Sequence, residues 1–108
     1  MSAPLVAVVA FNHFSPFHLS VPCIIFGDLL HDQKLFDLRI YAYESGKLQS
    51  SEGLIVESTL DADELGRADI IIVPSWRDPA EKPDQLLLDA LATAYTRGSQ
   101  IVGLCLGT

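Results

Sequence analysis

The sequence predicts an α/β domain with a parallel sheet, and three observations support this prediction. Residues 5–11 form a short, uninterrupted apolar run, and residues 69–73 and 100–104 are apolar or glycine after a polar first residue. Such segments are typical of strands buried on both faces of a parallel sheet. Segments with helical spacing lie between these runs, as the crossovers of a parallel sheet require. Of the 108 residues, 49% are hydrophobic and 19% are charged, which provides enough apolar side chains for one packed core.

The first apolar run, residues 5–11, is rich in β-branched side chains, and we expect it to form a central strand. A turn at Asn12 and His13 should follow it. Ser15 then offers a helix cap, and Pro16 suits the first helical turn because its missing N–H would have no intrahelical partner there.

The helix that begins there has an ambiguous pattern. Four apolar residues are spaced to line one of its faces, namely Phe17, Val21, Ile24 and Ile25. Pro22 lies within the pattern and cannot donate a hydrogen bond to the carbonyl of His18. The helix therefore either kinks at Pro22 or begins later, near Ser20.

The middle of the chain predicts smaller elements. Residues 36–43 alternate apolar and polar side chains, which is typical of a strand covered on one face. A turn at residues 45–46 leads into a weaker run, and residues 54–56 are expected to add a short edge strand. Residues 61–64 resemble a capping box, which predicts a helix of one or two turns that ends by Gly66.

The last third predicts a strand, a helix and a strand. Residues 69–73 run directly into the loop at residues 74–76, and a helix follows in which five apolar side chains recur at helical spacing: Leu87, Leu88, Leu91, Ala94 and Tyr95. Gly98 supplies its C-terminal stop. The final strand, residues 100–104, then leads to Cys105.

Cys105 stands in the pattern Gly-x-Cys-x-Gly, residues 103–107. This pattern is typical of a nucleophile elbow, a tight turn that projects one side chain from the sheet edge, with glycines where neighbouring Cβ atoms would clash. The helix whose N-terminal amides would lower the pKa of the thiol is not among the 108 residues. The simpler alternative is that Cys105 is a small buried apolar residue.

The charge balance argues against direct binding of DNA. Seven Lys and Arg stand against 14 Asp and Glu, which gives a net charge of -7 and a pI near 4.6. Phosphate contacts need a basic face, so this segment alone is not expected to bind nucleic acid.

The sequence also gives expectations about location and cofactors. The apolar stretch near the N-terminus follows no basic residues and is too short to span a membrane, so a cytoplasmic protein without a membrane partner is expected. Cys23 and Cys105 lie far apart in the chain, so we expect reduced thiols rather than a disulfide. No metal-ligand spacing is present, and no cofactor is expected.

Three segments carry a family resemblance: residues 15–27 (SPFHLSVPCIIFG), residues 71–79 (IIVPSWRDP) and residues 101–107 (IVGLCLG). They resemble the first half of a ThiJ/PfpI-type domain, most closely the N-terminal sensor domain of AraC-family transcriptional regulators. The resemblance spans the whole chain. It implies a three-layer sandwich around a parallel sheet, flavodoxin-like and similar to the class I glutamine amidotransferases.

Domains of this type usually run to nearly twice the length of this chain. The resemblance therefore implies that residues 1–108 are the N-terminal part of the domain and end at the elbow. In AraC-type regulators a pair of helix-turn-helix motifs follows and binds DNA. The chain is either a fragment or the product of a cut at the elbow, in which case a complementary C-terminal polypeptide completes the domain.

The resemblance also implies roles for single residues. Cys105 matches the elbow cysteine, which is the nucleophile of the family's enzymes and an oxidisable or ligand-facing thiol in several relatives. His18 falls where those enzymes hold an acid, and an imidazolium there would favour a thiolate without replacing a carboxylate. Ser75 and Trp76 stand where the enzymes have two glycines, so Trp76 suggests an aromatic wall of a pocket.

The predicted ligand site consists of Cys105, Trp76, Ser75, His18, His13 and Gly107. If the protein is an enzyme, Cys105 and His18 are its candidate catalytic residues. Simpler interpretations are a helix residue bonded to backbone for His18, an exposed loop residue for His13 and a core cysteine for Cys23.

Two functions fit these residues. The favoured one is a sensor module that binds a small molecule, forms a homodimer and signals to a DNA-binding domain outside this chain. The other is a cysteine-dependent amidase or hydratase that acts on a small nitrogenous substrate. A glutaminase subunit fits less well, because residues 74–76 lack the expected glycines.

Overall fold

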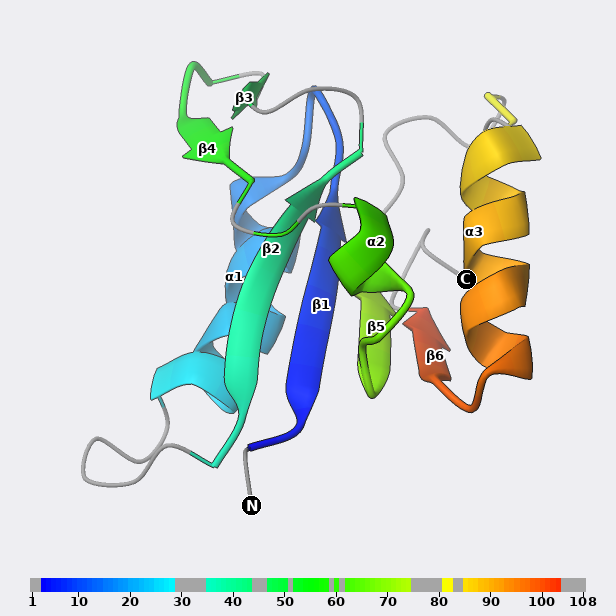
Figure 1. The fold of residues 1–108 in the computed structure, drawn as a ribbon. Helices are drawn as coiled ribbons and strands as arrows, with labels where there is room; N and C mark the ends of the chain where they lie inside the picture. Colours follow the sequence, from blue (N-terminus) through cyan, green and yellow to red (C-terminus); the bar gives the residue numbers. More distant parts are fainter. Residues whose placement is uncertain are drawn as a thin grey trace.

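The computed structural model describes residues 3–28, 35–43, 47–50, 52–58, 60, 62–74, 81–82 and 85–103. In this part of the chain, a parallel sheet is built from β1 (Leu5–Ala10), β2 (Asp37–Ala42), β5 (Ile70–Val73) and β6 (Gln100–Gly103). The strands lie in the order β2-β1-β5-β6 (Figure 1). Counted along the chain, this is the order 2-1-3-4 with which a flavodoxin-like sheet begins.

Strand β1 is the centre of this sheet, as its apolar sequence predicts. It pairs with β2 on one side and β5 on the other, so that Val8 faces Ile40 and Ile72 across the two ladders. Every residue of β1 after Leu5 is buried. A strand buried on both faces has no need of alternating polar residues, which explains the uninterrupted run.

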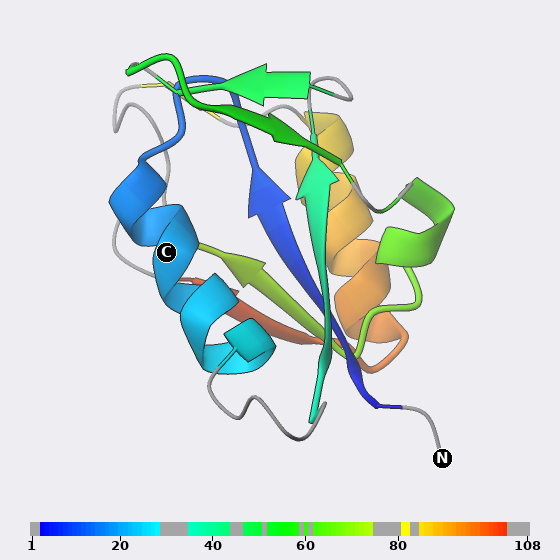
Figure 2. The same ribbon diagram turned by 90° about the vertical axis from the view of Figure 1, so that its left-hand side faces the viewer.

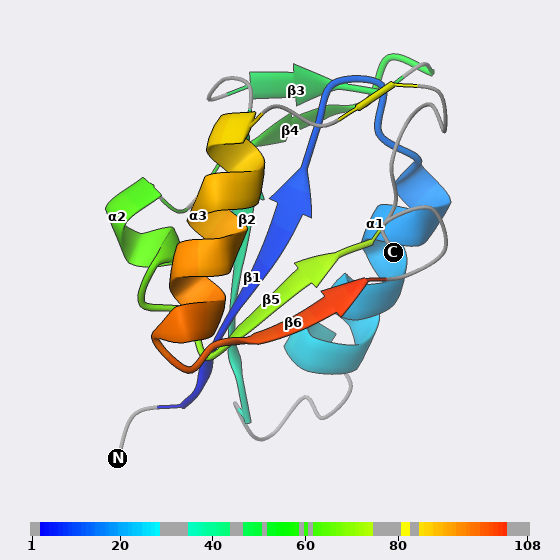
Figure 3. The ribbon, with the colours of Figure 1, turned by 90° about the vertical axis from the view of Figure 1, so that its right-hand side faces the viewer.

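Helices cover both faces of the sheet and complete three layers (Figures 2 and 3). Along β1, Ala7 and Val9 pack in a cluster with Leu87 of helix α3 (Gln85–Thr96). On the opposite face, Val8 and Ala10 pack in a second cluster with Leu19 of helix α1 (Pro16–Cys23). The predicted three-layer α/β fold is therefore confirmed.

Helix α1 begins where the Ser-Pro pair predicts. The side chain of Ser15 caps it by accepting from the backbone N–H of His18, and Pro16 is its first residue. The alternative start near Ser20 is wrong. The helix instead runs through Pro22 and continues as a π-helix, η1 (Ile24–Asp28). The hydrogen-bond pattern therefore changes from α to π two residues after Pro22, which has no N–H to donate.

The face of α1 that packs on the sheet differs from the face expected from the sequence. Leu19 and Pro22 are buried, whereas Phe17 is 71% exposed and Ile24 is 56% exposed. Apolar residues occur all around this short helix, so spacing alone could not identify the packed face.

A small hairpin lies beyond the ends of β1 and β2 (Figure 1). Its strands, β3 (Lys47–Gln49) and β4 (Ile55–Glu57), are antiparallel and form a sheet of their own. Buried Leu48 anchors the hairpin in the α1-side cluster. The predicted edge strand at residues 54–56 is therefore one arm of this hairpin rather than an edge of the main sheet.

Helices α2 (Ala62–Leu65) and α3 cover the other face of the sheet. Gly98 ends α3 with a φ of 106°, as predicted from the sequence. The N–H of Ser99 donates to the carbonyl of Ala94 and the N–H of Gly98 donates to that of Tyr95, both at 3.0 Å, which is the Schellman arrangement.

Candidate functional site

The parallel register brings several loops to one edge of the sheet. Ala10, the last residue of β1, pairs with Ala42, the last of β2, and Val73 at the end of β5 pairs with Gly103 at the end of β6. The carboxyl ends of these four strands therefore lie at the same edge of the sheet. In open α/β sheets, ligands bind at this carboxyl edge.

Four of the predicted site residues, Ser75, Trp76, Cys105 and Gly107, lie outside the described residues. The described chain reaches buried Pro74 after β5 and Gly103 in β6. The roles of the four site residues that are not described, and the nucleophile elbow itself, remain predictions from the sequence.

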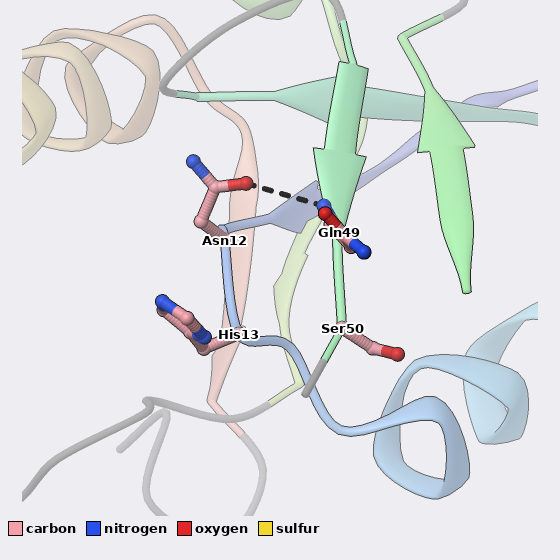
Figure 4. Close-up of a pocket in the computed structure, with 4 residues that line it drawn as sticks. All are labelled: Asn12, His13, Gln49 and Ser50. Atoms are coloured by element: carbon pink, nitrogen blue, oxygen red, sulfur yellow. Dashed lines mark hydrogen bonds between the residues drawn. The ribbon is translucent and has the colours of Figure 1, made fainter. Parts of the chain in front are cut away.

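The turn after β1 is fixed to the hairpin by two hydrogen bonds. The backbone N–H of His13 donates to the carbonyl of Gln49 at 2.8 Å, and the N–H of Gln49 donates to Oδ1 of Asn12 at 3.2 Å (Figure 4). His13 has a φ of 64°, in the left-handed region, where histidine and asparagine occur more often than most residues. Two segments separated by 37 residues in sequence thus form one unit.

An open pocket of about 660 Å³ lies at this unit. Its described lining residues are Asn12, His13, Gln49 and Ser50. The side chains of Asn12 and His13 project to the same side of the loop, away from the side chain of Ser50 (Figure 4). The hydroxyl of Ser50 accepts from the N–H groups of Glu52 and Leu54 and so holds the hairpin turn.

The side chains of Asn12, His13 and Gln49 in this lining carry amide and imidazole groups. Such groups can orient a small polar ligand through hydrogen bonds. Among the described residues, no group of three or more His, Cys, Asp or Glu side chains could hold a metal ion.

His18 is placed in the first turn of α1 and is half-buried. Its Nδ1 lies 2.8 Å from Oγ of Ser15, and its ring meets that of Phe17 edge to face at 5.3 Å between centroids. The ring of His18 thus bonds to the side chain of the helix cap, whereas the simpler interpretation expected a bond to backbone. His18 is not among the described residues that line the pocket, whereas His13 is.

Cys23 is a free, half-buried cysteine on α1. Burial raises the pKa of its thiol, because the charged thiolate would lose hydration. The thiol therefore stays protonated at neutral pH and is a poor nucleophile.

The sequence did not identify Asn12, Gln49 and Ser50 as pocket residues. The turn at Asn12 was recognisable, but its partner on β3 depends on where the hairpin folds. One local signal indicated the pocket. Asn12 and His13 are a polar pair that follows a buried strand and precedes the start of a helix.

No protein-family model matches the chain, and no curated protein matches it. Solved structures do share its fold. One is described as a "putative transcriptional regulator protein" from Vibrio parahaemolyticus, with a TM-score of 0.75 and 20% identity over 98% of this chain and 58% of that chain. Another is an AraC family transcriptional regulator from Pseudomonas putida, with a TM-score of 0.61 and 25% identity over 93% of this chain and 55% of that chain.

This chain thus spans a little over half the length of each of these two proteins. In the part of the chain that the structure describes, no helix is long and apolar enough to cross a membrane.

Proposed function

We propose that this chain is the ligand-sensing and dimerisation part of an AraC-type transcriptional regulator. The observation that carries the proposal is the likeness to the AraC family regulator from Pseudomonas putida, which extends over 93% of this chain at 25% identity. The Vibrio parahaemolyticus protein, with the higher TM-score of 0.75 and 20% identity, supports the fold.

The pocket at the carboxyl edge is the proposed sensing site. Asn12 and His13 contribute from the β1–α1 turn and Gln49 from the hairpin. Strands β5 and β6, which precede Ser75, Trp76 and Cys105 in the sequence, end at the same edge. A ligand that contacts both the turn and the hairpin would change the position of one relative to the other. A ligand shifts a protein between two conformations only if it binds one of them more tightly. Two relative positions of the turn and the hairpin would provide such a pair of conformations.

DNA binding belongs to a separate domain in this proposal. With 7 basic against 14 acidic residues, the chain has too little positive charge for a phosphate-binding face of its own. The proposal has three further parts: a homodimer, a C-terminal polypeptide that completes the α/β domain, and a cytoplasmic location. Each is testable on the full-length protein.

The test uses full-length protein and DNA fragments of its own genome. We expect it to retain specific fragments, and we expect fractions of a cell metabolite extract to change their affinity. Asn12→Ala combined with His13→Ala should abolish the response to extract while leaving DNA affinity unchanged. A full-length protein that selects no DNA sequence contradicts the proposal.

A cysteine-dependent amidase or hydratase is the second candidate, favoured by the Gly-Leu-Cys-Leu-Gly motif at residues 103–107. Alkylation by iodoacetamide at pH 7 separates it from the sensor. A catalytic Cys105 should react much faster than Cys23, whose pKa is raised by burial and which serves as an internal reference. Equal, slow reaction of both thiols supports the sensor.

A further inference from the structure

Helices α2 and α3 lie on the same face of the sheet (Figure 3). A second hollow is lined by residues of these two helices and of the segments that follow them. Its volume is about 310 Å³, and Asp63, Gly66, Arg67, Thr93 and Arg97 are among its lining residues. Helix α2 ends just before β5 begins, and α3 ends just before β6 begins. This groove is therefore near the amino edge of the sheet, opposite the pocket at Asn12 and His13.

The absence of a side chain at Gly66 makes room for Arg97. A Cβ atom built on Gly66 would lie 2.9 Å from Nη1 of Arg97, closer than real Cβ contacts allow. The guanidinium thus rests against the backbone at the end of α2. Thr93 lies one helical turn before Arg97 and faces the same groove.

The two guanidinium groups are available to a ligand. Arg67 and Arg97 come from different segments, and neither forms an ion pair within the described part of the chain. The chain has only 7 Lys and Arg in total, so two of them line one hollow of a protein with net charge -7. Like charges in one groove repel each other, and a bound anion would relieve that repulsion.

We propose that this groove binds a compact anionic group, a carboxylate or a phosphate. Arg67 and Arg97 are its charged donors, and the hydroxyl of Thr93 is a neutral donor. Guanidinium groups suit both anions because their planar N–H groups can donate two parallel hydrogen bonds. The carboxylate of Asp63 lies in the same lining and limits the affinity. The site is separate from the proposed sensing pocket and does not depend on it.

The test is calorimetric titration of the full-length protein at low ionic strength, with inorganic phosphate and, separately, with succinate. We expect millimolar or tighter binding of at least one anion, and the tighter binder indicates the natural chemical group. Arg97→Gln and Arg67→Gln should each weaken binding about tenfold or more. Asp63→Asn should tighten it, because a like charge is removed.

Two further variants separate geometry from net charge. Gly66→Ala keeps every charge but displaces the Arg97 guanidinium, so it should weaken binding severalfold. Arg39→Gln removes a positive charge on β2, where Arg39 pairs with Asp37 at 3.0 Å, and should leave binding unchanged. Circular dichroism confirms that each variant is folded.

Three results would overturn the proposal. They are no binding of either anion at millimolar concentration, undiminished binding by folded Arg97→Gln, and an equal loss in Arg39→Gln.

Discussion

Asn12 shows how one side chain joins two distant parts of the candidate site. Asparagine after a buried strand predicts a turn, and the structure confirms a turn with His13 at a positive φ. The hydrogen bond from Gln49 to Asn12 could not be predicted, because it depends on the placement of a hairpin 37 residues away.

Removing the Oδ1 of Asn12, which accepts from the N–H of Gln49, should loosen the hairpin. In Asn12→Ala, the N–H of Gln49 loses its partner, and we expect a loss of about 0.5–1.5 kcal/mol in the free energy of unfolding. Hydrogen exchange of the Gln49 amide in the full-length protein should accelerate. Asn12→Asp keeps an oxygen at the same position and is the matched control. Equal exchange in Asn12→Ala and the parent protein would show that the bond does not hold the turn.

Helix α1 marks the limit of what local sequence predicts about an element. Its start was predictable, because a Ser cap followed by Pro has a specific geometry at a helix N-terminus. Its packed face was not, because both Phe17 and Leu19 are large and apolar. Only the position of α1 against β1 and the hairpin buries Leu19.

A pair of truncations tests this orientation. Leu19→Ala removes a buried side chain and should destabilise the full-length protein by about 2–5 kcal/mol, because a cavity remains. Phe17→Ala should cost much less, since Phe17 is 71% exposed here. Chemical denaturation measures both. A larger loss for Phe17→Ala would mean that another part of the protein covers that face.

At the scale of the whole molecule, the fold was the most predictable feature. Each uninterrupted apolar run became a parallel strand, because a strand buried on both faces leaves a strong sequence signal. The hairpin of β3 and β4 was less predictable, because short strands with mixed exposure give weak patterns. The predicted site could be only partly placed, with His13 at the pocket and His18 at the helix cap.

The distribution of apolar surface gives a prediction for the chain by itself. Phe17, Ile24 and Ile25 are exposed on α1 and η1, and Val102 on β6 is 37% exposed. Exposed apolar side chains of this number favour association. Residues 1–108 expressed alone should aggregate or co-purify with a complementary polypeptide when sized by chromatography. A soluble monomer that unfolds cooperatively would contradict this prediction.

The central claim is that the turn after β1 and the elbow cysteine meet at the carboxyl edge of the sheet as one ligand site. A short thiol-to-thiol crosslinker, applied to the full-length protein with Cys23→Ser and His13→Cys, tests it most directly. We predict an intramolecular crosslink between position 13 and Cys105, and none in the control Tyr95→Cys, where position 95 is exposed near the end of α3. A crosslink from position 95, or none from position 13, would contradict the account.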